Sequence, residues 1–481
     1  MSKFEYAPAP ESASVVDIDS SYGLFIDGEF VDGSGAAMKT VNPATEEVLA
    51  DVAVADEEDV DRAVAAARRA QEQVWGPMPG AERAKYLFRI ARLLAERSRE
   101  FAVLETLDNG KPIRESRDVD VPTAAAHFFY YAGWADKLSY AGYGSDPRPH
   151  GVAGQVIPWN FPLLMLAWKI APALATGNTV VLKPAETTPL TALLFADLLR
   201  QAELPPGVVN IITGAGPTGS ALVRHAGVDK VAFTGSTAVG KQIAKQIAGT
   251  RTRATLELGG KAANIVFDDA PVDQAIEGIV NGIYFNQGQV CCAGSRLLVQ
   301  ESVAEEVTER LKGRLSTLRV GDPMDKNTDV GAINSAAQLE RITALTQAGD
   351  EEGATRWTSD CPLPETGYWF APTVFTDVSS AHRIAREEIF GPVLSVLTFR
   401  TPAEAIAKAN TIPYGLSAGI WTEKGSRILA MADAMRAGVV WANTFNRFDP
   451  TSPFGGYKES GYGREGGRHG LAPYLVEGGT R

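Results

Sequence analysis

Residues 179–212 read TVVLKPAETTPLTALLFADLLRQAELPPGVVNII and contain the pattern that decides the fold. Two short runs rich in β-branched residues, TVVLK and VVNII, flank a stretch in which Thr188 and Pro189 precede a long apolar segment. β-Branched runs indicate strands, and proline is favoured in the first turn of a helix. The stretch therefore predicts a strand, a helix and a second strand, the repeating unit of a parallel sheet.

The same alternation continues toward the carboxyl end. It passes through a short helix, the strand KVAF (230–233), a helix from Val239 and the run ANIVF (263–267). This alternation predicts a nucleotide-binding type of sheet with crossover helices. A second alternation starts at RLLVQ (296–300) and ends at VVWAN (439–443). Its expected helices cover residues from about 303 to 318, 402–409 and 426–437, so we expect a second α/β domain.

Two amphipathic helices are predicted upstream, around residues 60–67 and 87–94, from apolar side chains spaced three and four residues apart. The most apolar stretch, residues 161–182, carries Lys169 at its middle and is interrupted by Pro162, Pro172 and Gly177. A membrane-spanning helix needs about 20 predominantly apolar residues, so this stretch indicates a buried helix followed by a strand.

The overall composition excludes several classes of protein. A chain of 481 residues suggests two or three domains. Its 46 basic and 58 acidic residues give a net charge of −12, and no basic stripe is present. We therefore expect neither a nucleic-acid partner nor an anionic membrane partner.

The cysteines indicate a reducing compartment. The chain has three cysteines, Cys291, Cys292 and Cys361. An odd number with two adjacent residues does not fit a framework of disulfide bonds. Residues 1–20 are polar, lack a targeting pattern and are expected to form a loosely ordered extension. These features predict a cytoplasmic protein.

Two glycine-rich turns follow predicted strands. Gly214, Gly216 and Gly219 have dinucleotide-fingerprint spacing, but no acid follows about 20 residues on, so a plain tight turn explains them equally well. One unit later, Gly235 and Ser236 open a helix whose free N–H groups would favour a phosphate. An ordinary helix cap would have the same pattern.

Three side chains are candidates for catalysis. Cys291 follows a Gly-Gln turn near an expected helix start, where a thiol pKa is lowered, although free cysteines often only pack. The five histidines are isolated, which predicts no metal site and makes a carboxylate the expected base. Glu257 lies between apolar neighbours that would raise its pKa, or it is a surface acid on a half-buried strand. Asn160, fixed by Pro158, Trp159 and Pro162, is either an oxyanion donor or part of a rigid corner.

Taken together, the segments resemble the aldehyde dehydrogenase superfamily, in the right order, from about Tyr22 to about Arg464. The matching motifs are PWNFP (158–162), LKPAE (182–186), FTGSTAVG (233–240), LELGGK (256–261), FNQGQVCCAGSR (285–296), EEIFGPV (387–393), NTIPYGLSAG (410–419) and PFGGYKESGYGRE (453–465).

The resemblance implies a role for each catalytic candidate. Cys291 would be the nucleophile that attacks the aldehyde, with Cys292 a bystander. The Asn160 amide and the Cys291 backbone N–H would hold the oxyanion of the thiohemiacetal. Once hydride has left, Glu257 would activate the water that hydrolyses the thioester. Subfamilies that transfer the acyl group to coenzyme A typically lack this glutamate, so the resemblance favours the hydrolytic branch.

The resemblance also implies the cofactor and the substrate pocket. Glu186 pairs with Lys183 at the adenosine ribose and would repel a 2′-phosphate, which favours NAD over NADP. The implied cofactor residues are Ile157, Pro158, Trp159, Lys183, Glu186, Gly235, Ser236, Leu258, Glu388 and Phe390. The implied substrate pocket consists of Met165, Trp168, Phe285 and Phe448. These apolar and aromatic side chains indicate an aliphatic or aromatic aldehyde, and an aromatic box for a quaternary ammonium group stays open.

The expected fold is α/β, with a Rossmann-like parallel-sheet cofactor domain, a second α/β catalytic domain and a small oligomerisation arm. After the extension at 1–20, the cofactor domain is expected at 21–132 and 150–258, the bridging segments at 133–149 and 466–481, and the catalytic domain at 259–465.

The arm departs from the family pattern. Only 16 residues separate Lys137 from Gly154, where the family usually has a longer insert. In addition, Pro473 is expected to disturb the pairing of the final strand. We therefore expect a homodimer in place of the standard tetramer.

Two alternatives use the same residues differently. An esterase or acyl-transferring cysteine enzyme would use the Cys291 thiol without redox chemistry. A catalytically silent oligomeric or binding protein could also be built on this fold, because a fold alone does not establish activity.

Overall fold

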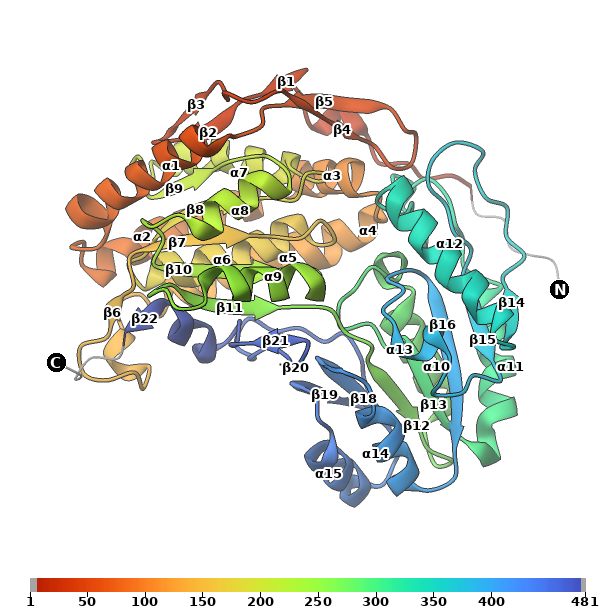
Figure 1. Ribbon diagram of the computed structural model, residues 1–481. Helices are drawn as coiled ribbons and strands as arrows, with labels where there is room; N and C mark the ends of the chain where they lie inside the picture. The colour runs from red at the N-terminus through yellow and green to blue at the C-terminus, as the bar shows by residue number, and fades with distance from the viewer. Residues whose placement is uncertain (1–6, 477–481) are drawn as a thin grey trace.

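The computed structural model describes residues 7–476, which form two large sheets with helices packed against them (Figure 1). The first sheet has eight strands in the order β21-β11-β10-β7-β8-β9-β2-β3. Its parallel centre follows the predicted alternation, with Lys230–Thr234 (β10) hydrogen-bonded between Val152–Val156 (β7) and Arg253–Glu257 (β11). The other strands are Thr179–Lys183 (β8), Val209–Ile211 (β9), Leu24–Ile26 (β2) and Glu29–Val31 (β3).

Both faces of this sheet are buried, because successive side chains of a strand point to opposite sides. Val152, Val181 and Val231 pack on one face in a cluster with residues of α1 (Glu57–Ala70), α8 (Gly216–Arg224) and α9 (Thr237–Ile247). Ala153 and Val180 pack on the other face with α6 (Pro162–Ala175) and α7 (Leu190–Gln201). The remaining helices of this half are α2 (Gly80–Glu96), α3 (Ser98–Asn109), α4 (Ile113–Glu115) and α5 (Val121–Ala132).

The second sheet has seven strands in the order β14-β15-β16-β13-β12-β18-β19. They are Thr355–Thr358 (β14), Thr373–Thr376 (β15), Val393–Phe399 (β16), Arg296–Gln300 (β13), Ala263–Val266 (β12), Ser417–Trp421 (β18) and Val439–Ala442 (β19). The accompanying helices are α10 (Val272–Ile283), α11 (Ala304–Leu315), α12 (Ala336–Glu351), α13 (Arg383–Arg386), α14 (Pro402–Asn410) and α15 (Gly425–Ala434). The second predicted alternation is present in this sheet.

One assignment to the first alternation is wrong. The run beginning at Ala263 was expected to continue the nucleotide-binding sheet, but β12 pairs with β13 and β18 in the second sheet. The fifth parallel strand of the first sheet is β11 instead, which ends at Glu257. We propose the division at residues 258 and 259 as the border between the two domains.

The carboxyl-terminal segment returns to the first domain, below β11 in Figure 1. Gly461–Tyr462 (β21) pairs antiparallel with β11, so that Glu257 lies opposite Gly461. Tyr457–Lys458 (β20) pairs with Tyr414–Gly415 (β17), and Ser21–Tyr22 (β1), Val48–Val52 (β5) and Met38–Val41 (β4) form a small separate sheet.

Among residues 7–476, the expected arm contains one short ladder. Arg148–Pro149 (β6) pairs antiparallel with Leu475–Val476 (β22), and Pro473 lies in the preceding 3-10 helix (Arg468–Tyr474), where it does not interrupt the pairing. Residues 477–481 of the expected bridging segment lie outside the described residues.

The expectation of a loosely ordered N-terminal extension is wrong for residues 7–20. The backbone of Pro10 pairs with Asp325, and the Glu11 carboxylate contacts Arg99 at 2.5 Å and Lys326 at 3.3 Å. The segment therefore links α3 of the first domain to a loop of the second. Residues 1–6 lie outside the described residues. In the part of the chain that the structure describes, no helix is both long and apolar enough to cross a membrane.

Candidate active site

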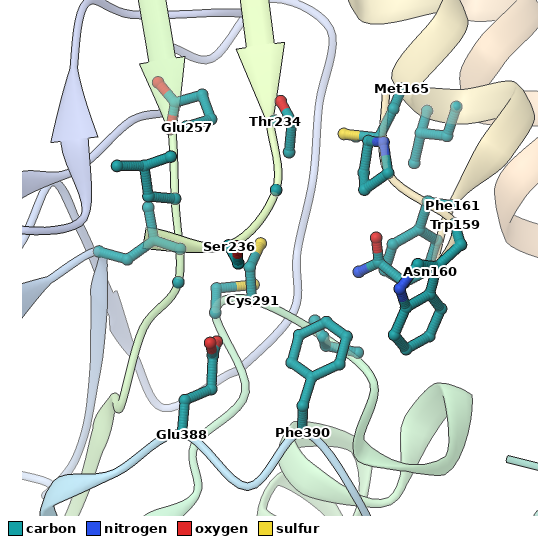
Figure 2. Close-up of a pocket in the computed structure, with 18 of the residues that line it drawn as sticks. Trp159, Asn160, Phe161, Met165, Thr234, Ser236, Glu257, Cys291, Glu388 and Phe390 are labelled. Carbon is teal, nitrogen blue, oxygen red and sulfur yellow. The ribbon is translucent and has the colours of Figure 1, made fainter. Parts of the chain in front are cut away.

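A cavity of about 440 Å³ lies where the carboxyl ends of β10 and β11 meet the second domain. Figure 2 shows side chains from both domains around this space. Most of the predicted site residues line it: Pro158, Trp159, Asn160, Met165, Trp168, Gly235, Ser236, Glu257, Leu258, Phe285, Cys291, Glu388, Phe390 and Phe448. Ile157, Lys183 and Glu186 lie outside its walls, at or just after the carboxyl ends of β7 and β8.

Cys291 follows a strained loop. Asn286 and Gln287 have φ angles of 47° and 54°, and Gly288 follows at 73°, all in the left-handed region. A Cβ on Gly288 would lie 2.1 Å from the carbonyl oxygen of Gly391, so glycine is required there. Such backbone persists only where surrounding contacts hold it.

The side chains of the loop provide those contacts. Gln287 donates from Nε2 to the carbonyl of Ala332 at 3.0 Å and accepts from the N–H of Gly331 at 3.2 Å. Gln289 Oε1 accepts from the N–H of Asn334 at 3.0 Å. The polar residues of the motif thus anchor the turn that presents the thiol.

The expected lowering of the Cys291 pKa is wrong for this state of the protein. Cys291 lies in a turn after the short 3-10 segment Phe285–Gly288 and not at the start of a helix. Contact with Cys292 and burial raise the pKa of the Cys291 thiol well above its ordinary value. Cys292 itself is buried, and its Sγ lies 3.7 Å from Asn446 Oδ1.

Glu257 ends β11, is buried and lines the cavity above Cys291 in the view of Figure 2. Within residues 7–476 neither carboxyl oxygen has a hydrogen-bond partner. Burial, followed by the nearby charge of Glu465, raises the pKa of Glu257 well above 4.5. A buried acid with free oxygens beside a cavity can accept a proton from a water molecule placed there.

Two charged residues near Glu257, Lys169 and Glu465, were not predicted from the sequence to belong to the site. The Lys169 ammonium contacts Glu465 Oε1 and donates to Thr234 Oγ1 at 2.7 Å. Lys169 interrupts the most apolar stretch of the sequence, which was a usable signal because lysine is rarely buried without a partner. Glu465 ends a recognised motif, but nothing local indicates that it meets a helix 296 residues earlier in the chain.

Asn160 joins the substrate side of the cavity to the nucleophile loop. Its Nδ2 donates to the carbonyl of Gln289 at 2.9 Å, and its own carbonyl accepts from Asn286 Nδ2 at 2.8 Å. The amide nitrogen carries two N–H donors, so one remains for a ligand in the cavity. A developing oxyanion on a carbon bonded to Cys291 would need a donor of this kind.

The loop before α9 can hold a pyrophosphate. Ser236 caps α9 by accepting from the N–H of Val239 at 3.3 Å, and the N–H of Gly235 donates to the carbonyl of Glu257 at 3.0 Å. The first turn of this helix leaves N–H groups without intrahelical partners, which favours an anion. The loop is therefore hydrogen-bonded to the strand that carries Glu257.

Lys183 and Glu186 form a pair at the carboxyl end of β8. Lys183 Nζ lies 3.8 Å from Glu186 Oε2 and donates to the carbonyl of Gly214 at 2.6 Å. The Glu186 side chain is 54% exposed and so can accept hydroxyl donors. Gly214 thus belongs to the surroundings of Lys183, while the phosphate-type helix end is at Gly235.

Glu388 and Phe390 approach the cavity from the second domain (Figure 2). Glu388 Oε1 accepts from the N–H of Gly260 at 2.9 Å, and burial raises its pKa to about 7. Phe390 has a φ of 59° and packs edge-on against Trp159 with ring centroids 5.2 Å apart. The two rings form an apolar wall on which a flat ring could lie.

The other end of the cavity is aromatic. Trp168 lies 6.4 Å from Phe448 and 5.2 Å from Phe454, and Phe161 stacks on Phe285 at 6.1 Å, all between ring centroids. Phe161 and Phe454 also line the cavity, although only their motifs were noted from the sequence. In residues 7–476 no group of His, Cys, Asp and Glu side chains is placed to hold a metal ion.

Comparison with known proteins gives consistent results. The model of the aldehyde dehydrogenase family matches residues 30–477. The chain is 48% identical over 464 residues to the mitochondrial benzaldehyde dehydrogenase of Antirrhinum majus, covering 94% of this chain and 87% of that protein. It is 46% identical over 486 residues to the mitochondrial aldehyde dehydrogenase of Rattus norvegicus, covering 97% and 92%. An NAD+ complex of the Bacillus cereus aldehyde dehydrogenase is similar in structure, with a TM-score of 0.92, 45% identity and coverage of 95% and 96%.

Proposed function

The chain belongs to the aldehyde dehydrogenase family, and from that premise we propose how its residues oxidise an aldehyde to the carboxylic acid with NAD+. It is an NAD-dependent aldehyde dehydrogenase. The observation that carries the proposed mechanism is the presence of Cys291, Asn160 and Glu257 around one cavity.

Cys291 is the nucleophile. Its Sγ attacks the aldehyde carbon and gives a thiohemiacetal, and the oxyanion is held by the free N–H of the Asn160 amide and the backbone N–H of Cys291. This requires the thiolate, whose formation is disfavoured by contact with Cys292 and by burial, because both raise the pKa of the thiol. Removal of the thiol proton is therefore part of the first step.

Glu257 is the base for hydrolysis. It takes a proton from water, and the hydroxide attacks the thioester on Cys291, which releases the acid and frees the sulfur. The raised pKa of Glu257 makes it a stronger base than an exposed carboxylate once it is ionised.

The surrounding residues fit a nicotinamide dinucleotide. The amino end of α9, with Gly235 and Ser236, would hold the pyrophosphate, and Lys183 with Glu186 would hold the adenosine ribose. Glu388 would accept hydroxyl donors of the second ribose, and Phe390 with Trp159 would hold the nicotinamide. Pro158 and Leu258 complete the cavity walls, and Ile157 lies just outside them, after the carboxyl end of β7. When bound, NAD+ supplies the hydride acceptor.

The preference for NAD over NADP rests on Glu186. A 2′-phosphate would bring a second negative group against its carboxylate, whereas a ribose hydroxyl can donate to it.

The substrate is an aliphatic or aromatic aldehyde that carries no phosphate or other strongly anionic group. Met165, Trp168, Phe285 and Phe448 present apolar surface, which offers no partner for an anionic group of the substrate. The similarity to a benzaldehyde dehydrogenase is in keeping with an aromatic ring in this space.

The assembly is a homodimer located in the cytoplasm. The short segment of 16 residues between Lys137 and Gly154 supports the dimer, because a short arm offers little surface for joining two dimers. The odd number of cysteines, two of them adjacent, supports a reducing compartment. Light scattering tests the dimer: a stable monomer or a tetramer would count against it. Fractionation of native cells tests the location.

The enzymatic test measures NADH formation across a panel of aldehydes, with NADP and coenzyme A in parallel reactions. Aromatic and aliphatic aldehydes should give NADH and free acid without coenzyme A. A strict requirement for coenzyme A would contradict the hydrolytic role of Glu257.

A further inference from the structure

A buried ionic cluster lies beneath the loop that carries Asn160. The Lys111 side chain is fully buried, and its Nζ donates to Asp120 Oδ2 at 2.6 Å and lies 3.6 Å from Glu105 Oε1. The same Nζ lies 4.3 Å from the centroid of the Phe161 ring. The Lys111 ammonium is held in this position because it is shielded from solvent and its charged partners lie here.

This lysine also holds the backbone of the oxyanion donor. Lys111 Nζ donates to the carbonyl oxygen of Asn160 at 2.9 Å. Asn286 Nδ2 donates to the same oxygen at 2.8 Å, so both lone pairs of the carbonyl are used. The peptide plane that follows Asn160 is thereby held from two directions.

The hydrogen bonds of helix α6 do not hold the Asn160 carbonyl. Asn160 precedes α6, which begins at Pro162, and the first turn of the helix uses the carbonyl of Phe161 instead, as the acceptor for Met165. Phe161, at the N-cap position, makes no side-chain capping bond. Without Lys111 and Asn286 the Asn160 carbonyl would be buried and unpaired, at a cost that would favour its rotation.

The acids of the cluster connect it to the rest of the site. Glu105 Oε2 accepts from the N–H of Leu163 at 3.2 Å, and Glu115 Oε2 accepts from the N–H of Asn286 at 2.9 Å. Burial raises the pKa of Glu115 to about 8 and also raises the pKa values of Glu105 and Asp120. Asp120, in direct contact with the ammonium, is the carboxyl group best placed to keep its charge.

We propose that Lys111 is a positioning residue of the active site: held by Asp120, it fixes the Asn160 carbonyl and so aims the Asn160 amide at the substrate oxyanion. This inference rests on the proposed function, because it assigns Lys111 a part in the oxyanion step. Lys111 touches no reacting atom and acts only through Asn160.

The test is a double-mutant cycle of Lys111→Met with Asn160→Ala. Pre-steady-state NADH formation with one aldehyde reports the steps through hydride transfer. Lys111→Met should slow this phase roughly 10- to 100-fold, since small misplacements of a catalytic group have effects of that size. In the Asn160→Ala background the same change should have little further effect, because the amide it positions is gone.

Three controls separate positioning from a structural role. Arg83→Met removes another buried cation that donates to backbone carbonyls, those of Met78 and Ala175, away from the cavity, and should leave the burst rate unchanged. NAD+ affinity and the rate of Cys291 alkylation by iodoacetamide should be unaffected in Lys111→Met. If that variant does not fold, Asp120→Asn, which keeps the lysine but weakens its hold, should slow the burst in the same Asn160-dependent way.

The outcomes are distinguishable. An unchanged burst in Lys111→Met, or an equal loss in both backgrounds, would overturn the proposal. Absence of NADH formation by the wild-type enzyme with every aldehyde would instead overturn the proposed function.

Discussion

Asn160 Nδ2 donates to the carbonyl oxygen of Gln289 at 2.9 Å, which ties the proposed oxyanion donor to the loop that ends at the nucleophile. The return bond from Asn286 Nδ2 to the Asn160 carbonyl makes the link reciprocal. Asn160 is therefore hydrogen-bonded to the loop that precedes Cys291, although the two residues lie 131 residues apart in the sequence (291 − 160). These hydrogen bonds cross the proposed border between the two domains.

Replacing Asn160 should impair the formation of the thiohemiacetal oxyanion. Asn160→Ala is expected to lower kcat roughly 100- to 1,000-fold, the usual effect of losing one oxyanion donor. Asn210→Ala removes another buried amide that donates to backbone carbonyls, within the first sheet, and is the matched control. Steady-state kinetics should show the loss only in Asn160→Ala, and equal activities would refute the assigned role.

Replacing Glu257 should separate the two halves of the reaction. In Glu257→Gln the thioester can form but its hydrolysis lacks a base, so steady-state turnover should fall roughly 100- to 10,000-fold. Rapid mixing should still show a burst of about one NADH per active site. A proportional loss of burst and turnover would mean that Glu257 acts before hydride transfer.

The pH dependence follows from the burial of Glu257. Burial disfavours its charged form and raises its pKa above 4.5, so the carboxyl is protonated and inactive as a base below that raised pKa. The rate of thioester hydrolysis should rise with pH, and its acid limb should lie well above the ordinary carboxyl range. Single-turnover hydrolysis measured against pH tests this, and a limb near 4.5 would contradict it.

Replacing Glu186 should relax the cofactor preference. Glu186→Ser removes the charge that opposes a 2′-phosphate, and the ratio of kcat/KM for NADP to that for NAD should rise about tenfold or more. Glu203→Gln, which neutralises an exposed acid paired with Arg89, should leave the ratio unchanged. An unchanged ratio in Glu186→Ser would place the determinant elsewhere.

Much of the fold could be predicted because its signals are local. The strands at 179–183 and 230–234 and the helix from Leu190 follow from side-chain periodicity and turn residues. Sheet membership is not local. The run at Ala263–Val266 has the same composition as the strands before it, yet it pairs with β13 and β18.

The active site, like the fold, has some features that local sequence predicts and others that depend on distant parts of the chain. Cys291, Glu257 and Asn160 could be selected from their flanking residues and from the family resemblance, and the cavity contains all three. The raised pKa of Cys291 could not be foreseen, because it depends on burial and on contact with Cys292. Lys111 and Glu465 act through partners far away in the chain, which no local pattern reveals.

The most direct test of the mechanism identifies the sulfur that carries the acyl group. Glu257→Gln, quenched in acid after mixing with aldehyde and NAD+, should accumulate the thioester. Tandem mass spectrometry that cleaves the backbone between Cys291 and Cys292 locates the added mass. The account predicts acylation of Cys291 and its disappearance in the Cys291→Ser, Glu257→Gln double variant. An acyl group on Cys292, or on no cysteine during NADH formation, would contradict it.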